Sequence, residues 1–307
     1  MSISDNKVTV LILTYNEALF TTECIASVLQ SARVEAEVIV IDNGSVDDTF
    51  DKLKSNFGGR ITLIRNEKNL GAAGGRNQGI ECFLSNSKNR YLLLLDNDTI
   101  LKKDTLYEML HLLHDDPKIG VVAPFEYYYD HPDVISYAGG AYIDWGRGSF
   151  YGSMQGEARK TGEIVRELDV APSGFILVKR EVFERAGGFD SRYFIYFEDP
   201  DWCLRARKAG YKIAATSRAE LLHRTSQSLG METPSFYYYR TRNRFLFMEK
   251  NADSFHRLRF NCYFAYEFIM LTLPTLVLNK MWKQLKAVCA GIVDHLRGRY
   301  GEKVCTW

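Results

Sequence analysis

Residues 8–17 read Val-Thr-Val-Leu-Ile-Leu-Thr-Tyr-Asn-Glu. The stretch begins as an apolar, β-branched run and ends in polar residues, and apolar side chains then recur at helical spacing from Leu19 to Leu29. This pattern predicts a strand, a loop and a helix, in that order.

The same unit recurs along the next part of the chain. Val38–Ile41 is followed by a second polar turn and a helical pattern, and residues 61–64 and 91–95 are two further apolar runs. Uninterrupted apolar runs are typical of strands that helices cover on both faces. The sequence therefore predicts an α/β fold with a doubly wound, mostly parallel, Rossmann-like sheet.

Polar residues gather where these predicted strands end. They lie at 14–17, 42–45, 69–77 and 96–98. Because ligands of open α/β sheets bind at the carboxyl ends of the strands, we expect these four segments to form one site.

The segment Asp96-Asn97-Asp98 directly follows the apolar run Leu92–Leu95. Two carboxylates at the end of a buried strand are costly without a cation. Their oxygens suit Mg²⁺ or Mn²⁺ that bridges a diphosphate. A plain turn of Asp and Asn gives the same pattern, so the motif needs partners.

Five motifs, at residues 8–17, 40–49, 69–79, 94–98 and 197–205, occur in a fixed order. Together they resemble glycosyltransferase family 2 with the GT-A fold, and most closely its bacterial rhamnosyltransferase-like branch. The resemblance implies an inverting, metal-dependent transfer of a sugar from a nucleotide diphosphate sugar to an acceptor hydroxyl. The branch implies dTDP-rhamnose and a polysaccharide or lipid-linked saccharide acceptor, and a UDP-sugar donor is the alternative.

The resemblance also assigns the donor site. The residues implied to surround the nucleotide sugar are Thr14, Tyr15, Asn16, Glu17, Asp42, Asn43, Gly71, Ala72, Gly75, Arg76, Asn77, Asp96 and Asn97. Asp42 would accept a hydrogen bond from the nucleotide, and the glycine-rich loop would let the backbone approach it closely. Arg76 would face the diphosphate. On their own, the glycine-rich loop is structurally ambiguous and Asp42-Asn43 is compatible with a surface turn.

A second acidic motif, Glu198-Asp199, follows the aromatic segment 193–197. Carboxylates against aromatic surface have raised pKa values and can act as bases. By resemblance Asp199 is the base that takes the proton of the acceptor hydroxyl, and Glu198 orients the acceptor. The alternative is that both acids only charge the first turn of a helix that begins near Asp201.

Further residues are implied around these two motifs. Asp98 is the implied metal ligand, and His223 resembles the later histidine of the family that completes the metal shell. A histidine after apolar residues is also commonly structural. Ser173, Gly174 and Trp202 are expected on the acceptor side, with core packing as the alternative for Trp202.

The character of the chain changes after Pro234. We predict a catalytic domain at 1–235, with a nucleotide-binding half at about 1–100, an acceptor-binding half at about 101–235, and a C-terminal helical extension at 236–307. Residues 260–278 are strongly apolar. Peripheral membrane contact, a buried helix and a homodimer contact are three interpretations of this segment. The basic residues that favour an anionic membrane surface are Arg257, Arg259, Lys280, Lys283 and Lys286.

Composition excludes other classes. The chain has 39 basic and 38 acidic residues, so no bulk charge attracts nucleic acid and we expect no such partner. Its cysteines lack the spacing of a zinc site or a disulfide framework, which indicates a reducing compartment. These cysteines are Cys24, Cys82, Cys203, Cys262, Cys289 and Cys305. Residues 1–7 contain no hydrophobic signal segment, and we expect a cytoplasmic location, including the inner face of the cell membrane.

Three competing functions can be weighed from the motifs. A nucleotidyltransferase would carry a basic, glycine-rich loop after its first strand, and a dinucleotide oxidoreductase would carry Gly-x-Gly-x-x-Gly there. This chain has residues 14–17 at that place, Thr-Tyr-Asn-Glu. A non-catalytic sugar-nucleotide-binding protein is disfavoured because both the metal acid and the base acid are present.

Overall fold

The predicted apolar runs form the centre of one mixed sheet in the computed structural model, which describes residues 6–224 and 233–303. The strands are β1 (Lys7–Thr14), β2 (Glu35–Asp42), β3 (Thr62–Arg65), β4 (Tyr91–Asp96), β5 (Thr99–Leu101), β6 (Ile119–Tyr128), β7 (Ile135–Tyr137), β8 (Tyr142–Asp144), β9 (Ser149–Tyr151), β10 (Val165–Leu168), β11 (Phe175–Lys179) and β12 (Lys212–His223). The sheet has the order β10-β12-β6-β11-β4-β1-β2-β3, and β8 and β9 form a separate hairpin.

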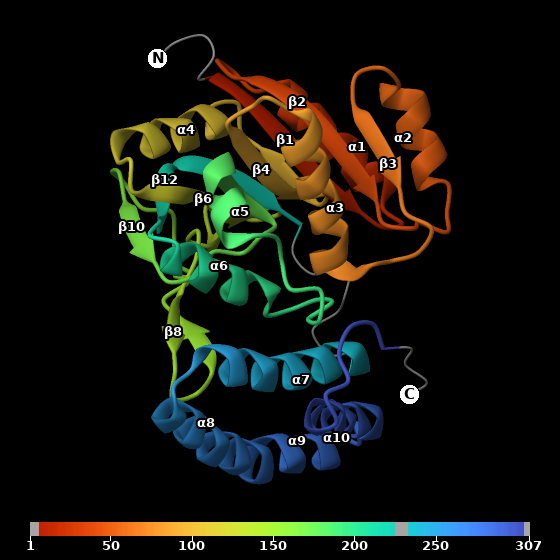
Figure 1. Cartoon of the computed structure of the whole chain (residues 1–307), viewed down its shortest axis with the longest axis vertical. Coiled ribbons are helices and arrows are strands. Elements are labelled where there is room, and N and C mark those ends of the chain that lie inside the picture. The colour runs from red at the N-terminus through yellow and green to blue at the C-terminus, as the bar shows by residue number, and fades with distance from the viewer. Residues whose placement is uncertain (1–5, 225–232, 304–307) are drawn as a thin grey trace.

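The helices alternate with the strands in the first half of the chain and follow them in the last quarter. They are α1 (Ala18–Leu29), α2 (Thr49–Phe57), α3 (Gly71–Asn86), α4 (Thr105–Asp115), α5 (Arg180–Ala186), α6 (Glu198–Lys208), α7 (Pro234–Asn251), α8 (Ser254–Glu267), a π-helical turn (Phe268–Thr272), α9 (Leu273–Leu278) and α10 (Trp282–Leu296). This arrangement confirms the predicted α/β class with a C-terminal helical part (Figure 1).

The alternation of side chains along β4 divides the core between the two sheet faces. Leu92 and Leu94 pack with residues of α3, α5 and α6, whereas Leu93 and Leu95 pack with residues of α1 and α4. All four side chains are almost completely buried, and each contributes roughly 1.5–3 kcal/mol of burial free energy. The two faces explain why this strand has no polar alternation.

Strand register brings the polar strand ends together. β1 pairs in parallel with β2 and β4, so that Thr14 lies opposite Asp42 and Leu13 lies opposite Asp96. β11 runs antiparallel between β4 and β6. Gly174, just before β11, accepts a hydrogen bond from the Asp96 backbone N–H at 2.7 Å. Segments distant in sequence therefore meet at one edge of the sheet.

The C-terminal helices form a layer beside the sheet domain (Figure 1). Leu246, Phe247 and Met248 of α7 belong to the same buried cluster as the sheet residues, so residues on both sides of position 235 share one core. The β8–β9 hairpin reaches this layer, where Trp145 stacks on Phe247 with ring centroids 5.8 Å apart. The division of function at residue 235 remains a prediction.

Two local predictions are wrong. The glycine-rich segment 71–77 is not a loop, because it forms the first turns of α3. α6 begins at Glu198 rather than near Asp201. Residues 1–5 and Cys305 lie outside the described residues, so the structure does not test what the sequence suggests for them.

Candidate active site

The loop after β1 is tied to the loop after β2. Asn16 adopts a positive φ of 58°, accepts a hydrogen bond from the Val46 backbone N–H at 2.8 Å and donates its own N–H to the Ser45 hydroxyl. Tyr15 is exposed beside it. Partial burial raises the pKa of Glu17, and the negative charge of Asp98 raises it further. Glu17 and Asp98 therefore lie close enough to interact electrostatically, as the prediction of one shared site requires.

Thr14 and Asn97 hold the acidic turn in place. The Thr14 hydroxyl is buried and lies 2.7 Å from the Thr21 hydroxyl. The Asn97 amide donates to both hydroxyls, at 3.3 and 3.2 Å. Because these groups satisfy one another, they fix the backbone between Asp96 and Asp98, whose carboxylates stay partly exposed.

Asp42 is buried at the end of β2. Its Oδ1 accepts the Ser45 backbone N–H at 3.0 Å, and Arg65 lies 3.5 Å from Oδ2. Oδ2 has no hydrogen-bond partner within the described chain. This spare acceptor is what the predicted contact with a nucleotide donor group needs.

The side chains of Asn43 and Asn77 hold chain segments together, and the placement of these residues at the nucleotide sugar stays a prediction. Asn43 is buried and its amide bonds to Asn69, Gly71, Asn66 and Leu70. The Asn77 amide donates to the Phe189 carbonyl at 2.8 Å and accepts the Phe189 N–H at 2.7 Å. Both amides are fully used in holding chain segments together.

The glycines of α3 serve close packing. A Cβ on Gly75 would lie 2.5 Å from a methyl of Leu13, and one on Gly71 would lie 2.3 Å from the Phe194 carbonyl oxygen. Gly71 also has a φ of +74°, which side chains rarely adopt. These glycines seat α3 against β1 and against the segment before Glu198. Ala72 is partly exposed on the first turn, and its donor contact remains a prediction.

The sequence predicts that Arg76 faces the diphosphate. In the structure, its side chain does not face an open site. It is buried, with its guanidinium 2.6 Å from Asp96 and 3.5 Å from Glu198. Arg76 therefore joins the acid of the strand-end motif to the acid of the second motif. An arginine buried between two carboxylates is suited to holding both motifs in a fixed relation.

Asp199 differs from Glu198 in what it faces. Asp199 lines a cavity of about 370 Å³, whereas Glu198 is buried against Arg76. Burial raises the pKa of both carboxyls. Arg76 opposes this shift in each, and Ser173 also opposes it at Asp199. The helix start also suits acidic residues, but only Asp199 combines this position with a cavity.

The residues predicted on the acceptor side differ in their surroundings. Ser173 lies beside Asp199, and a Cβ on Gly174 would lie 2.1 Å from an Asp96 carboxylate oxygen. Trp202 is completely buried and its indole N–H donates to the Gly187 carbonyl at 2.9 Å. The burial of Trp202 favours core packing, the alternative interpretation, over a contact with the acceptor.

His223 and Asp98 meet across the sheet edge. The His223 Nε2 lies 3.1 Å from Asp98, and Nδ1 lies 2.9 Å from the buried carboxylate of Glu126. Burial lowers the pKa of His223, but the hydrogen bonds with Asp98 and Glu126 outweigh this effect and raise it to about 11. Because a metal binds the neutral imidazole, a cation at this place would have to displace a proton.

The donor set fits a divalent cation that is completed by its substrate. Asp98 supplies oxygen and His223 supplies nitrogen, and Glu126 fixes the far ring nitrogen, as carboxylates commonly do for metal-binding histidines. No group of three or more His, Cys, Asp or Glu side chains arranged to hold a metal occurs within residues 6–224 and 233–303. The remaining ligands would be diphosphate oxygens and water.

Sequence reasoning missed Glu126. It is one carboxylate within a strand whose other residues are almost all buried, Ile-Gly-Val-Val-Ala-Pro-Phe-Glu-Tyr-Tyr at 119–128. A buried charge needs a partner, so this lone acid was a signal. The identity of the partner, His223, required the fold, because 97 positions separate the two residues.

A clamp from α7 holds the segment before Glu198, and no motif in the sequence indicates it. Phe194, Tyr196 and Phe197 all have positive φ values, of 65°, 65° and 70°. The Asn243 amide donates to the carbonyls of Tyr193, Ile195 and Tyr196 at 2.7–2.9 Å. The neighbouring Arg242 donates to the carbonyls of Arg192, Tyr193 and Gly301. This clamp stabilises an otherwise unfavourable backbone next to Asp199.

We expect Asn243→Ala to lower the free energy of unfolding by roughly 3 kcal/mol, because it leaves buried carbonyls without donors. Chemical denaturation measures this value. The same change at the exposed Asn261 of α8 is the control and should cost less than about 0.5 kcal/mol. Equal stability of the two variants would contradict the clamp.

Comparisons with known proteins identify the family and the fold. The family model described as Glycosyl transferase family 2 matches residues 9–187, which is more than half of the chain. That range includes β1 to β4 and the strand-end motifs, and it ends before the acid pair at Glu198.

Two relatives align with longer stretches of the chain than the family model does. It is 24% identical over 257 residues to the dTDP-rhamnosyl transferase RfbF of Shigella flexneri, covering 78% of this chain and 79% of that protein. It is 29% identical over 206 residues to the uncharacterized protein y4gI of Sinorhizobium fredii, covering 64% of this chain. The chain spans only 22% of the length of y4gI.

Solved structures share the fold. The mannosyltransferase PcManGT of Pyrobaculum calidifontis, in complex with GDP-Man and Mn²⁺, aligns with a TM-score of 0.57 at 16% identity, over 95% of this chain and 87% of that one. GalNAc-T7 with UDP, GalNAc and Mn²⁺ aligns with a TM-score of 0.60 at 16% identity, over 88% of this chain and 57% of that one. The GT-A fold is thereby confirmed, and with the family match, this chain belongs to glycosyltransferase family 2.

Proposed function

We propose that this glycosyltransferase is inverting and metal-dependent, and that it transfers L-rhamnose from dTDP-rhamnose to a hydroxyl of a glycan or lipid-linked saccharide in cell-surface polysaccharide synthesis. The observation that carries the proposal is the placement of Asp199. Its carboxylate lines the cavity at the start of α6, and Glu198, Arg76 and Asp96 connect it to the strand-end motif. The dTDP-rhamnosyl relative, matched over most of both chains, supports this donor first.

In the proposed reaction the acceptor hydroxyl lies in the cavity against Asp199. The ionised Asp199 accepts the hydroxyl proton as the acceptor oxygen attacks the anomeric carbon, and the nucleoside diphosphate leaves from the opposite face. One displacement of this kind inverts the anomeric centre. Mg²⁺ or Mn²⁺ at Asp98 and His223 would supply charge neutralisation for the leaving diphosphate.

A donor panel tests the proposal. We expect dTDP-rhamnose with Mg²⁺ or Mn²⁺ to raise the melting temperature and to be consumed, with a product of opposite anomeric configuration by NMR. A larger response to UDP-glucose, UDP-galactose or UDP-N-acetylglucosamine would replace the donor assignment and keep the reaction class. Binding of a donor without turnover on any acceptor would favour a non-catalytic sugar-nucleotide-binding protein.

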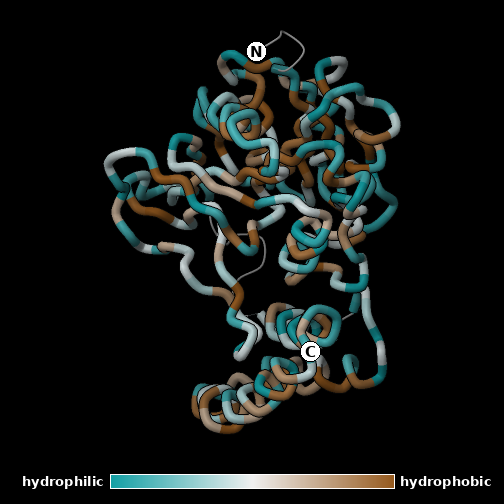
Figure 2. Tube along the Cα trace, turned by 60° about the vertical axis from the view of Figure 1, so that its left-hand side comes forward, coloured by the Kyte–Doolittle hydropathy of each residue, from teal (hydrophilic) through white to brown (hydrophobic). Residues whose placement is uncertain are grey.

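We further propose that the enzyme works in the cytoplasm and touches the inner face of the membrane through α8 and α9. Among the described residues, Ser254–Leu278 is the one helical segment long and apolar enough to cross a membrane, a weak signal by itself. Almost none of it is buried, and Figure 2 shows hydrophobic residues along it. Its exposed apolar residues include Phe255, Leu258, Tyr266, Ile269, Met270, Leu271, Val277 and Leu278. Glu267 in its middle pairs with Arg244 of α7, which favours a helix that lies along the surface.

The double variant Ile269→Glu with Leu278→Glu is expected to reduce co-sedimentation with phosphatidylglycerol vesicles by more than about tenfold, because each buried side chain contributes roughly 1.5–3 kcal/mol. Val165→Glu, at another exposed apolar position, on β10, is the control. Equal recovery of all three proteins would contradict membrane contact. A shift from dimer to monomer with unchanged vesicle binding would instead assign this face to a homodimer.

These point variants test membrane contact more specifically than removal of all residues after Asn251 would. α10 packs on α7, the Tyr238 hydroxyl of α7 donates to the buried Asp294 at 2.8 Å, and Arg242 donates to the Gly301 carbonyl. Truncation would expose these buried groups and weaken the clamp beside Asp199.

A further inference from the structure

The cavity at Asp199, the proposed base, is also lined by residues of the C-terminal helices α7 and α8. Its volume of about 370 Å³ lies in the range of small-molecule sites. Aromatic side chains form much of its wall, namely Tyr137, Phe150, Tyr196, Phe197 and Phe236. Charged side chains of the C-terminal helices complete the lining, namely Arg240 and Arg244 of α7 and Glu267 of α8. The cavity is therefore bordered both by the carboxylate of Asp199 and by guanidinium groups of α7.

The two arginines are not equivalent. Arg244 is paired with Glu267 at 2.6 Å and also donates to the Arg147 carbonyl. Arg240 lies over the Phe236 ring at 5.4 Å and has no ion pair or side-chain hydrogen bond among the residues that the structure describes. The Arg240 side chain lines the cavity and is exposed, so its guanidinium group is accessible to an anion.

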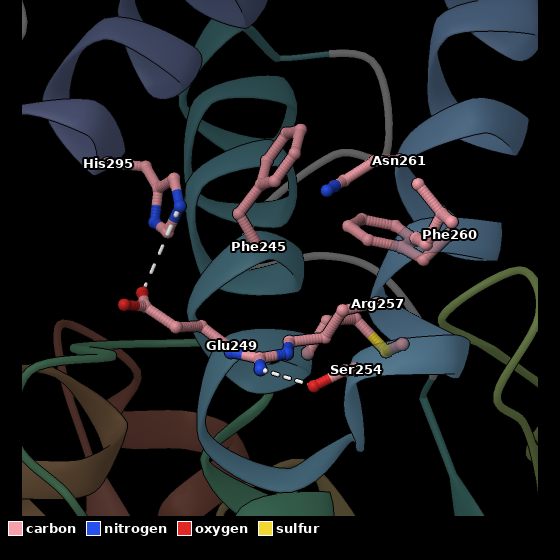
Figure 3. Close-up of a pocket in the computed structure, with 9 residues that line it drawn as sticks. Phe245, Glu249, Ser254, Arg257, Phe260, Asn261 and His295 are labelled. Atoms are coloured by element: carbon pink, nitrogen blue, oxygen red, sulfur yellow. Dashed lines mark hydrogen bonds and ion pairs between the residues drawn. The ribbon is translucent and has the colours of Figure 1, made fainter.

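A second cavity lies between α7, α8 and α10, with a volume of about 380 Å³ (Figure 3). Its charged groups already face partners, since Glu249 lies 4.0 Å from His295 and Arg257 donates to the Ser254 hydroxyl at 3.2 Å. None of its lining residues belongs to the motifs assigned to the proposed reaction. Of these two cavities, the Asp199 cavity is therefore the one that combines the proposed base with an arginine that has no ion pair among the described residues.

The cavity is also next to the exposed apolar face. Glu267 of α8 lines the cavity, and Ile269, Met270 and Leu271, which follow it along the same helical segment, are exposed. A ligand that fills the cavity and extends beyond Arg240 would therefore meet an exposed apolar surface, which begins a few residues after Glu267. This arrangement suits an acceptor with a sugar, a phosphate and a lipid, in that order.

We propose that Arg240, with Arg244 beside it, binds the phosphate or diphosphate of a lipid-linked saccharide acceptor whose sugar hydroxyl reaches Asp199. This inference rests on the proposed function, because it specifies the acceptor of the same cavity. Arginine is well suited to phosphate because its planar group donates two parallel hydrogen bonds. The aromatic wall would contact the sugar, and the lipid would continue toward α8 and α9.

Binding of geranyl diphosphate tests the inference without knowledge of the saccharide. A chelator is included, so that no divalent cation binds the probe at Asp98. Calorimetry should show geranyl diphosphate bound to the wild-type full chain, about 10- to 100-fold weaker binding to Arg240→Gln, and a partial recovery in Arg240→Lys. Arg60→Gln, at an exposed position in the nucleotide-binding half, is the charge-matched control and should bind within about twofold of wild type.

The outcomes separate the two levels of the proposal. Unchanged affinity in Arg240→Gln, or an equal loss in Arg60→Gln, would overturn the anion site. Inorganic diphosphate binding as tightly as geranyl diphosphate would overturn the lipid-linked assignment. Affinity for dTDP with Mn²⁺ is measured on each variant and should not change. If the wild type transfers sugar but does not bind geranyl diphosphate, this inference is contradicted and the proposed function is not. If the wild type neither binds the donor nor transfers sugar, the proposed function itself is contradicted.

Discussion

Replacement of Asp98 by Ala is expected to abolish the metal dependence of nucleotide binding. The affinity for dTDP or UDP in Mn²⁺ should fall by more than about 100-fold, to the value measured in a chelator. In the proposed metal site Asp98 supplies the oxygen ligand and His223 the nitrogen ligand, so the loss of Asp98 would leave one imidazole to hold the cation. Titration calorimetry with and without Mn²⁺ measures both values.

Variants of two residues near Asp98 test how much each contributes to metal binding. His223→Ala should weaken Mn²⁺-dependent binding less than Asp98→Ala, because the diphosphate itself supplies ligands. Glu126→Gln removes the carboxylate that orients the ring, and changes of this kind typically cost about 10- to 100-fold in metal affinity. An unchanged Mn²⁺ effect in both Asp98→Ala and His223→Ala would refute the metal site.

The sequence predicted the fold because its signals were local. The apolar runs that became β1, β2 and β4 pair in the expected parallel sense, and their polar ends meet as Thr14, Asp42 and Asp96. Each of these signals depends on a few consecutive residues and on the rule that ligands bind at the carboxyl ends of strands. That rule needs no knowledge of which side chains touch.

The roles of individual side chains were harder to predict, because they depend on contacts across the fold. The sequence does not show that the Asn43 amide is consumed by Asn66 and Asn69, or that Arg76 is buried between two acids. A glycine-rich stretch is compatible with both a phosphate-binding loop and a closely packed helix, and here the packing contacts of α3 decide. Polar motif residues thus include both candidate ligand contacts and groups that position them.

Asn243 is a further residue whose role depends on a contact between distant segments. It lies in a helix that sequence reasoning assigned to an extension, yet it binds the carbonyls of Tyr193, Ile195 and Tyr196, about fifty residues away. A single polar side chain in a helix predicts an exposed position by default. Its function in holding the segment before Asp199 appears only when α7 packs against that segment.

Replacement of Asp199 by Asn should lower kcat for sugar transfer by about 10² to 10⁴-fold, the usual cost of losing a general base. Asparagine keeps the shape of the side chain but accepts no proton from the acceptor. The alternative, that Asp199 only favours the start of α6, predicts at most roughly 1 kcal/mol of stability and little loss of activity. The two interpretations therefore differ by orders of magnitude in rate.

The pH dependence provides a second criterion. Burial raises the pKa of Asp199, and a base must be ionised to act. The rate of the wild type should therefore fall with decreasing pH at a higher pH than the ordinary pKa of aspartate would give. This decrease should be absent from any residual rate of Asp199→Asn.

Glu198→Gln is the matched comparison, since it removes the adjacent carboxylate. Glu198 lies against the buried Arg76 at 3.5 Å, so this variant leaves that guanidinium with one fewer counter-charge. Its main effect should be a lower free energy of unfolding. Denaturation of both variants separates this effect from a loss of chemistry.

The most direct test measures kcat for sugar transfer and the nucleotide Kd in parallel for the wild type, Asp199→Asn and Glu198→Gln. We predict that Asp199→Asn binds the nucleotide within about twofold of wild type and has lost at least about 100-fold in kcat. An Asp199→Asn variant that binds normally and still transfers sugar within a few-fold of wild type would contradict the assignment of Asp199 as the base, and a comparable loss confined to Glu198→Gln would move that role to Glu198.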